Sequence, residues 1–150
     1  MFTDSQLQFL NDTANAALKA GHIYPAMAAC EAALESGYGT SGLAKTDHNL
    51  FGMKQHQHPV YGTHVLPTRE FENGAWIVIN ANWVSYPSTV ECFIDRMNTL
   101  KRLAPVYQHY AAALAAPDAG TYVTEVSKTW STDPNRATKV AGIYHAYTLS

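Results

Sequence analysis

Apolar residues recur every three or four positions over most of the chain, which is the spacing of helices that bury one face. The first helix is predicted over residues 4–20, with Asp4 as its N-cap and Gly21 as its stop. The second is predicted to begin at Pro25, a residue favoured in the first turn of a helix, and to end near Ser36, before two glycines. Further segments with this period follow at 88–100, 105–116, 118–130 and 132–147.

Two of the later helices begin with residues suited to capping their free backbone N–H groups. Ser88 and Glu91 have the spacing of a capping box, in which each side chain accepts from the backbone of the other residue. Asp133 is the expected N-cap of the last helix, with Pro134 in its first turn. One further short turn of helix is expected in TSGLA, residues 40–44.

The period changes to two in the middle of the chain. The runs VLPTREF and AWIVINANWV, residues 65–71 and 75–84, are rich in β-branched and aromatic residues and are predicted to be strands. Between them, Asn73-Gly74 is a strong signal for a tight hairpin, and residues 55–64 before them are predicted to form a polar loop. The pattern predicts an α+β fold, mainly α, in which a helical lobe carries one small inserted β-hairpin lobe.

Length and composition limit the classes of protein that fit. The 150 residues suit one domain over residues 1–150, and 47% hydrophobic against 15% charged residues exclude a disordered chain. The formal net charge is −2 and no basic run occurs, so nucleic acid is not an expected partner, whereas a neutral glycan is compatible. No stretch reaches the ~20 apolar residues of a membrane helix, so no membrane partner is expected.

The cysteines and histidines show no metal-binding pattern. Cys30 and Cys92 lie in different segments without a CxxC partner, so both are expected to be buried thiols, paired only if their helices cross closely. Four histidines of the central polar region fit no zinc spacing. They are His48, His56, His58 and His64. No metal and no cofactor are therefore expected.

Glu35 is the residue whose position points to chemistry. Glu31 and Glu35 are four residues apart and share a helix face. Glu35 falls in the last turn, where the negative end of the helix dipole and apolar neighbours such as Leu34 and Phe51 should raise its pKa. A carboxyl group protonated near neutral pH can donate the proton that glycosidic cleavage requires, and the following glycines would let a large substrate lie close. The alternative is a surface glutamate before a glycine cap.

Several motifs resemble the peptidoglycan-cleaving N-acetylglucosaminidases of glycoside hydrolase family 73. The segment ALESGYG, followed by SGLA and HNLFGMK, resembles that family's ALESGWG, SxLA and NNLFGIK. Further along, TREF resembles T-x-E-Y, NWVSYPS resembles F-R-x-Y-x-S, and WSTDPNRA resembles Y-A-T-D-P-x-Y-A. These motifs stand in family order over roughly residues 5–147, and linked motifs are far more specific than one short pattern.

The resemblance implies a lysozyme-like fold with a groove between the helical and β lobes. It also implies hydrolysis of the β-1,4 bond on the reducing side of N-acetylglucosamine in bacterial peptidoglycan strands. Glu35 corresponds to the general acid, and Glu70 to a second carboxylate that assists water or steadies positive charge at the sugar ring. Inverting, retaining and substrate-assisted routes all stay open. The groove is expected to be lined by aromatic residues, namely Tyr38, Phe51, Tyr86 and Trp130.

Three departures from the family pattern keep alternatives open. Trp130 and Arg136 stand where the family usually has tyrosines, and His48 replaces an asparagine. A hydroxyl role, if kept, would come from Tyr38, Tyr86 or Tyr122. The rival functions are a lytic transglycosylase on the same fold and a catalytically inactive wall-binding module.

The N-terminal residues show no signal-peptide pattern, since no basic segment precedes an apolar one. A monomer acting in the periplasm or cell wall is expected. It would arrive there through a holin, a secretion system or another route.

Overall fold

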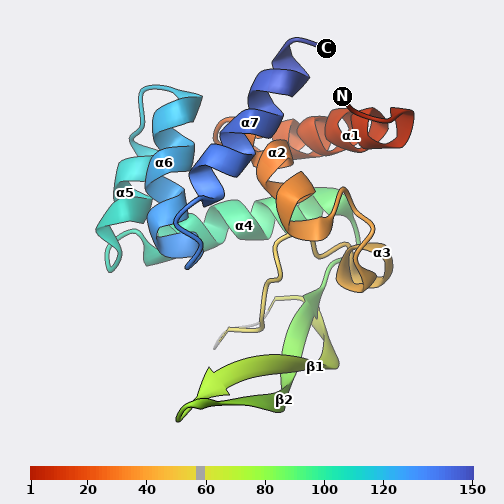
Figure 1. Cartoon of the computed structure of the whole chain (residues 1–150), viewed down its shortest axis with the longest axis vertical. Helices are drawn as coiled ribbons and strands as arrows, with labels where there is room; N and C mark the ends of the chain where they lie inside the picture. The colour runs from red at the N-terminus through yellow and green to blue at the C-terminus, as the bar shows by residue number, and fades with distance from the viewer. Residues whose placement is uncertain (57–59) are drawn as a thin grey trace.

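The computed structural model describes residues 1–56 and 60–150. Within these residues the chain forms seven helices and one antiparallel hairpin. The elements are α1 (Asp4–Lys19), α2 (Pro25–Ser36), α3 (Gly42–Asp47), β1 (Gly62–Glu72), β2 (Ala75–Ser85), α4 (Thr89–Leu103), α5 (Gln108–Leu114), α6 (Ala119–Trp130) and α7 (Arg136–Thr148). The helices gather in one lobe from which the hairpin projects, as Figure 1 shows. This confirms the predicted α+β fold, in which helices predominate. No helix in the described ranges is long and apolar enough to span a bilayer.

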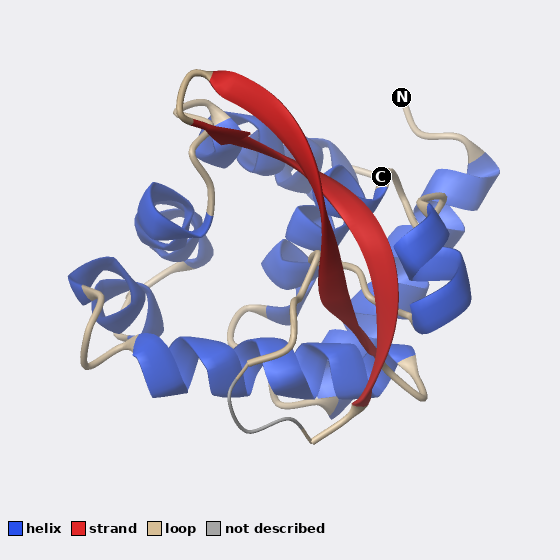
Figure 2. Ribbon diagram, turned by 90° about the horizontal axis from the view of Figure 1, so that it is seen from below, coloured by secondary structure: helices blue, strands red, loops and turns tan. Residues whose placement is uncertain are grey.

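The hairpin follows the sequence signal. β1 and β2 pair antiparallel from Gly62 opposite Ser85 to Glu72 opposite Ala75. At the turn, Asn73 and Gly74 have φ angles of 51° and 79°, the left-handed values that a tight two-residue turn requires. Both strands are longer than predicted, because the end of the expected polar loop already pairs with β2. Seen from below in Figure 2, the hairpin arches across the helical lobe.

The alanine-rich helix α2 lies at the centre of the core. Ala28 and Ala32 belong to a buried cluster with residues of α1, α3 and the hairpin base, while Met27 and Ala33 belong to a second cluster with α5, α6 and α7. Small side chains let neighbouring helices approach α2 on both sides. Cys30 and Cys92 are free and buried, as expected.

The N-cap of the first helix lies one residue earlier than predicted. Thr3 is the N-cap, and it forms a full capping box with Gln6. The prediction of Asp4 as the cap is wrong, because Thr3 offers the same chemistry together with the glutamine that completes the box. Asp4 instead opens the helix, where its charge suits the positive end of the dipole.

The last helix also starts differently. α7 begins at Arg136 with Asn135 as its N-cap, so Asp133 is not the cap. Asp133 closes a turn by accepting from the Asn135 backbone N–H at 2.9 Å and pairs with Lys139 at 2.7 Å. Pro134 therefore lies in this turn and not in the first helical turn.

The remaining boundaries differ in smaller ways. Ser88 caps α4 as predicted, but the Glu91 carboxylate accepts from the Tyr61 hydroxyl and does not return the capping-box bond. The helix predicted over 105–116 shortens to α5, because the chain turns after α4 around Pro105. The single turn expected in TSGLA extends to the six residues of α3, capped by the Ser41 hydroxyl.

Candidate active site

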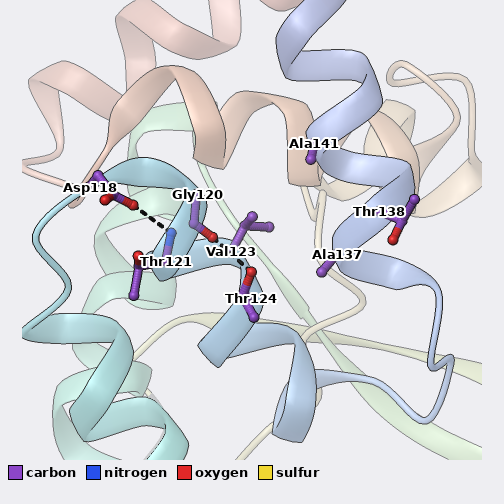
Figure 3. Close-up of a pocket in the computed structure, with 8 residues that line it drawn as sticks. All are labelled: Asp118, Gly120, Thr121, Val123, Thr124, Ala137, Thr138 and Ala141. Atoms are coloured by element: carbon purple, nitrogen blue, oxygen red, sulfur yellow. Dashed lines mark hydrogen bonds between the residues drawn. The ribbon is translucent and has the colours of Figure 1, made fainter.

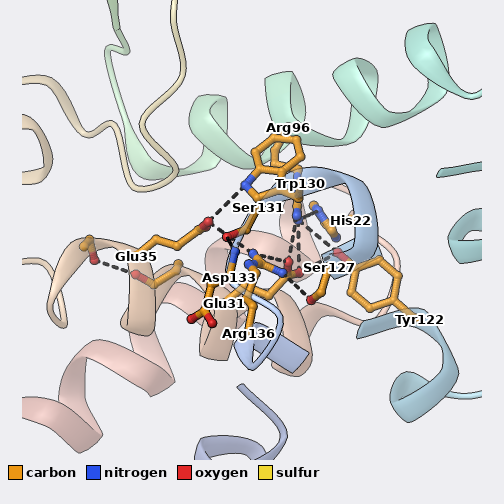
Figure 4. A network of polar contacts seen from close by, with 12 residues as sticks. His22, Glu31, Glu35, Arg96, Tyr122, Ser127, Trp130, Ser131, Asp133 and Arg136 are labelled. Atoms are coloured by element: carbon orange, nitrogen blue, oxygen red, sulfur yellow. Dashed lines mark hydrogen bonds and ion pairs between the residues drawn. The ribbon is translucent and has the colours of Figure 1, made fainter. Parts of the chain in front are cut away.

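Glu35 lies where three helix ends meet. It occupies the last turn of α2, which Gly37 ends in the left-handed conformation. Its Oε1 accepts a hydrogen bond from the indole Nε1 of Trp130, at the end of α6, at 3.0 Å. The same oxygen forms an ion pair with Nη2 of Arg136, at the start of α7, at 3.2 Å. Figure 4 shows the Glu35 side chain reaching toward both partners.

A buried charge cluster lies directly behind Glu35. The Glu31 side chain is fully buried and pairs with Nη2 of Arg96 and Nη2 of Arg136, both at 2.7 Å. The Tyr122 hydroxyl donates to Glu31 Oε1 at 2.5 Å. Because Arg136 Nη2 contacts both carboxylates, Glu31 and Glu35 share a helix face, as the spacing predicts.

The two glutamates have pKa values shifted in opposite directions. Burial alone would raise the pKa of Glu31, but the guanidinium groups of Arg96 and Arg136 outweigh it and hold that pKa at about 2. Burial raises the pKa of Glu35 to about 7; Arg136 opposes this rise and the charge of Glu31 adds to it. Whole-residue exposure of Glu35 is high, but its side chain is only 20% exposed. The predicted rise is confirmed, with burial as its main cause.

Arg96 fixes the aromatic wall beside Glu35. Its guanidinium lies 4.3 Å from the ring centroid of Trp130 and 4.5 Å from that of Phe51. Arg96 also donates from Nη1 to Nε2 of His22 at 3.1 Å, and burial with this positive neighbour lowers the His22 pKa to about 4. A neutral His22 therefore accepts from Arg96, and the guanidinium holds Trp130 in place.

Glu70, the second predicted carboxylate, lies on β1 opposite Ile77. Its Oε1 pairs with Nζ of Lys54 at 3.1 Å, and its side chain is 36% exposed. The Lys54 ammonium also lies 5.2 Å from the ring centroid of Trp83 on β2. The hairpin thus presents Glu70 beside the loop that follows α3.

A cavity of about 380 Å³ is lined by Trp130, which contacts Glu35, and by Lys54, which contacts Glu70. Its apolar lining includes Phe51, Tyr110 and Trp130, and Lys54 lies at its rim. Neither Glu35 nor Glu70 lines the cavity, but Trp130 donates to Glu35 and Lys54 donates to Glu70, so each carboxylate contacts one residue of the lining. Pockets of this size with aromatic walls are typical of small-ligand and sugar sites.

A second hollow of about 480 Å³ lies between α6 and α7 (Figure 3). The carboxylate that lines it, Asp118, already caps α6 by accepting from the Thr121 backbone N–H at 2.7 Å. No residue that lines this hollow makes a hydrogen bond or ion pair with Glu35 or Glu70, whereas the aromatic cavity is lined by Trp130 and Lys54, which contact them. The aromatic cavity is therefore the better candidate for the predicted site.

Comparison with known proteins settles the family. A family model described as Glucosaminidase, mannosyl-glycoprotein endo-beta-N-acetylglucosaminidase, matches residues 11–149. The chain belongs to this glucosaminidase family. The domain is accordingly a glycoside hydrolase domain, and the resemblance to glycoside hydrolase family 73 is confirmed.

Relatives of this glucosaminidase domain include a bacterial autolysin and a probable bacterial N-acetylmuramidase. The autolysin of Enterococcus faecalis strain V583 is 32% identical, over 99% of this chain and 21% of the relative. The probable N-acetylmuramidase of Lactococcus lactis subsp. lactis strain IL1403 is 27% identical, over 99% of this chain and 34% of the relative. The chain therefore spans about a fifth to a third of these curated relatives.

A solved structure supports the predicted lysozyme-like fold of the glucosaminidase domain. The catalytic domain of the autolysin Auto from Listeria monocytogenes matches with a TM-score of 0.83 and 27% identity, over 99% of this chain and 88% of that chain. The helical lobe with an inserted two-stranded hairpin is thus shared with an autolysin catalytic domain.

Two of the four predicted groove aromatics line the cavity of this glucosaminidase. Phe51 and Trp130 do so, with Trp130 half-buried and Phe51 buried. Tyr86 is only 3% exposed, its hydroxyl donates to Asp95, and its ring packs on Tyr61. The prediction that Tyr86 lines the groove is wrong, because its ring packs in the core and, unlike that of Phe51, does not line the cavity.

The fourth aromatic, Tyr38, lies in a different contact. Its backbone is left-handed, and its half-buried ring packs on Phe2 and Phe9 near the N-terminus. It does not line the cavity, and its contact with glycan stays a prediction.

Of the two glycines after Glu35, Gly39 has a role in the fold. It has a φ of 80°, and a Cβ at this position would lie 2.8 Å from the ring of Phe9. Phe9 of α1 fills the space beside Gly39, so the prediction that this glycine leaves room for substrate is wrong, whereas for Gly37 it stays a prediction. Only a residue without a side chain lets the loop close on α1 at this point.

Sequence reasoning missed the arginines that hold Glu35. The sequence marked Arg136 only as a replacement for a family tyrosine, and it gave no role to Arg96. One signal was available: Arg96 lies three residues after Phe93 and four before Leu100, on the apolar face of α4. A charge on a buried stripe requires a buried partner, and Glu31 is that partner.

The histidines of the central region have structural contacts. His48 ends α3 in the left-handed conformation, where asparagine is also common, and its Nδ1 lies 3.1 Å from the Tyr86 carbonyl oxygen. His64 Nδ1 pairs with Asp47 at 3.0 Å. His58 lies outside the described residues. Within those residues, no group of three His, Cys, Asp or Glu side chains could hold a metal ion.

Proposed function

We propose that this domain hydrolyses bacterial peptidoglycan at the β-1,4 bond on the reducing side of N-acetylglucosamine, with Glu35 as the general acid. The observation that carries the proposal is the environment of Glu35. Its pKa is raised to about 7 beside Trp130, which lines the aromatic cavity, so the carboxyl keeps its proton near the pH where a leaving sugar oxygen must receive one.

The hydrogen bonds of Glu35 assign its two oxygens different tasks. Trp130 and Arg136 both approach Oε1 from their N–H groups, so Oε1 acts as the acceptor. The proton of the neutral carboxyl therefore resides on Oε2, from which it is transferred to the glycosidic oxygen as the bond to the sugar breaks. Arg136 is a positioning residue here, since it acts on Glu35 and not on the substrate.

Glu70 is proposed as the second carboxylate. Its Oε1 pairs with the ammonium of Lys54 at 3.1 Å, and Lys54 lines the cavity. A carboxylate there activates water or stabilises the positive charge that develops on the sugar ring. The glycan strands of peptidoglycan are the proposed partner, and the cell wall or periplasm is the proposed place of action.

Exchanging Arg136 for the family's tyrosine should move the pH dependence of the enzyme. Removing a guanidinium that opposes the rise in the Glu35 pKa, while Glu31 stays negative, raises that pKa further. In Arg136→Tyr the alkaline limb of the kcat/KM profile should shift upward by about one pH unit, and Arg136→Lys should stay near wild type. Arg96, the other cation acting on Glu35, is unchanged in both.

Lys139→Gln is the matched control for Arg136, because it removes one positive charge from the exposed side of α7. The pH of the alkaline limb does not depend on the fraction of enzyme that is folded. It therefore distinguishes an effect of Arg136 on the Glu35 pKa from an effect on stability. An alkaline limb that stays in place or moves downward in Arg136→Tyr would contradict the role given to Arg136.

Mass spectrometry of digested peptidoglycan tests the proposed function. Fragments ending in a reducing N-acetylglucosamine are expected. A 1,6-anhydro end would identify a lytic transglycosylase instead, and a reducing N-acetylmuramic acid would identify a muramidase, the activity in the name of the lactococcal relative. Binding to sacculi without release of fragments would indicate a wall-binding module.

A further inference from the structure

The cavity beside Glu35 has a charge that the rest of the chain does not share. The whole chain carries a formal charge of −2, yet the described residues that line this cavity include Lys54 and Arg102 and no carboxylate. The aromatic rings of Phe51 and Trp130 line the same cavity and give it an apolar surface. The cavity therefore suits a ligand with an apolar ring face and a negative substituent.

The two cations of the rim differ in their partners. The Lys54 ammonium is already neutralised by Glu70 at 3.1 Å. Arg102 is exposed on α4, and its side chain makes no ion pair or hydrogen bond with any residue of the described ranges. A guanidinium has a planar set of donors that matches a carboxylate, so Arg102 is the member of the rim that is free to bind an anion.

The position of the cavity makes such an anion part of the substrate. Trp130 lines the cavity and also donates to Glu35, and Lys54 lines it and also pairs with Glu70. A saccharide in this cavity therefore touches one residue that contacts each candidate carboxylate. A substituent of that saccharide can therefore contact Arg102 while the scissile bond lies in the site.

We propose that Arg102 binds a carboxylate carried by the glycan, so that this enzyme favours acidic peptidoglycan over glycans that lack such groups. The inference rests on the proposed function and adds the substrate feature that is recognised. Two sources share this chemistry in peptidoglycan: the carboxylates of the peptide stem, and the lactyl carboxylate that is exposed when the stem is removed.

The test compares KM on soluble peptidoglycan fragments in three forms: native, stripped of stems by an amidase, and with all carboxyls converted to neutral amides by a carbodiimide and methylamine. Arg102→Gln should raise KM on native fragments about 3- to 10-fold, the effect of losing one partly exposed charged contact, and leave kcat unchanged. On amidated fragments Arg102→Gln and wild type should have equal KM values. Native fragments carry stem carboxylates, and stripped strands carry lactyl carboxylates in their place. A KM increase on native fragments alone points to the stem, and an increase on both shows that Arg102 binds either carboxylate.

Lys101→Gln is the matched control, because Lys101 is the neighbouring exposed cation of α4 and does not line the cavity. It should behave as wild type on all three substrates. Equal KM values for Arg102→Gln and wild type on native fragments would overturn the proposal, as would an equal increase on native and amidated fragments. If wild type releases no fragments from any form, the proposed function itself fails, which is a different result.

Discussion

Glu35→Gln is expected to lower kcat for peptidoglycan cleavage by about 10²- to 10⁴-fold at pH 6, the usual contribution of a general acid. Glutamine keeps the shape of the side chain and can still accept from Trp130, but it has no proton to give to the leaving oxygen. Release of reducing sugar from purified sacculi measures the effect. Glu125→Gln is the matched control, since Glu125 pairs with His109 and Lys128 and does not line the cavity.

The same variant should gain stability at alkaline pH, which shows that its loss of activity is not a loss of fold. Between the ordinary value of 4.5 and the raised pKa of about 7, folded Glu35 holds a proton that the unfolded chain has released. The free energy of unfolding therefore falls as pH rises through this window. Glu35→Gln should remove that fall and add at most about 3 kcal/mol above pH 7, with no gain below pH 4. Wild-type rates of lysis in Glu35→Gln would exclude Glu35 as the acid.

Glu31→Gln is expected to lower the free energy of unfolding by about 3–5 kcal/mol, the usual result of leaving a buried charge without its partner. Arg96 is fully buried and Arg136 is 2% exposed, and each loses its ion pair with Glu31. Urea unfolding at pH 7 measures the loss. Glu91→Gln serves as the control, because Glu91 is only half-buried and bonds to a single hydroxyl.

The contribution of Glu31 has its own pH signature. Because its folded pKa is lowered to about 2, it stabilises the fold fully above its ordinary value of 4.5, and this stability is lost as pH falls from there toward 2. The acid side of the wild-type stability curve should thus flatten in Glu31→Gln. A destabilisation below about 1 kcal/mol at pH 7 would show that the cluster does not support the fold in the way the burial implies.

Periodicity predicted the elements well because burial of one face repeats with each turn. α2 runs from Pro25 to Ser36 as predicted, and Asn73-Gly74 forms the turn that its left-handed backbone favours. The helix starts were harder to predict, because neighbouring residues compete for the same free N–H groups. Thr3 caps α1 in place of Asp4, since a glutamine three residues on completes its box.

The candidate site could be predicted only in part. The motif around Glu35 pointed to this residue as the candidate acid, and Trp130 donates a hydrogen bond to it. The cluster beneath it could not be read from local patterns, because Glu31 meets Arg96 and Arg136 across 65 and 105 residues of chain. Nothing in local sequence separates Tyr86, which is buried against Asp95, from an aromatic that lines a groove.

The central claim is that Glu35 keeps its proton near neutral pH. The most direct measurement is a pH titration of its side-chain carboxyl by ¹³C NMR in protein labelled at glutamate Cδ, with Glu35→Gln identifying the resonance. A midpoint near 7 is the predicted result, well above the ordinary value of 4.5. A midpoint at or below 4.5 would contradict the account, because Glu35 would then be ionised and have no proton to donate.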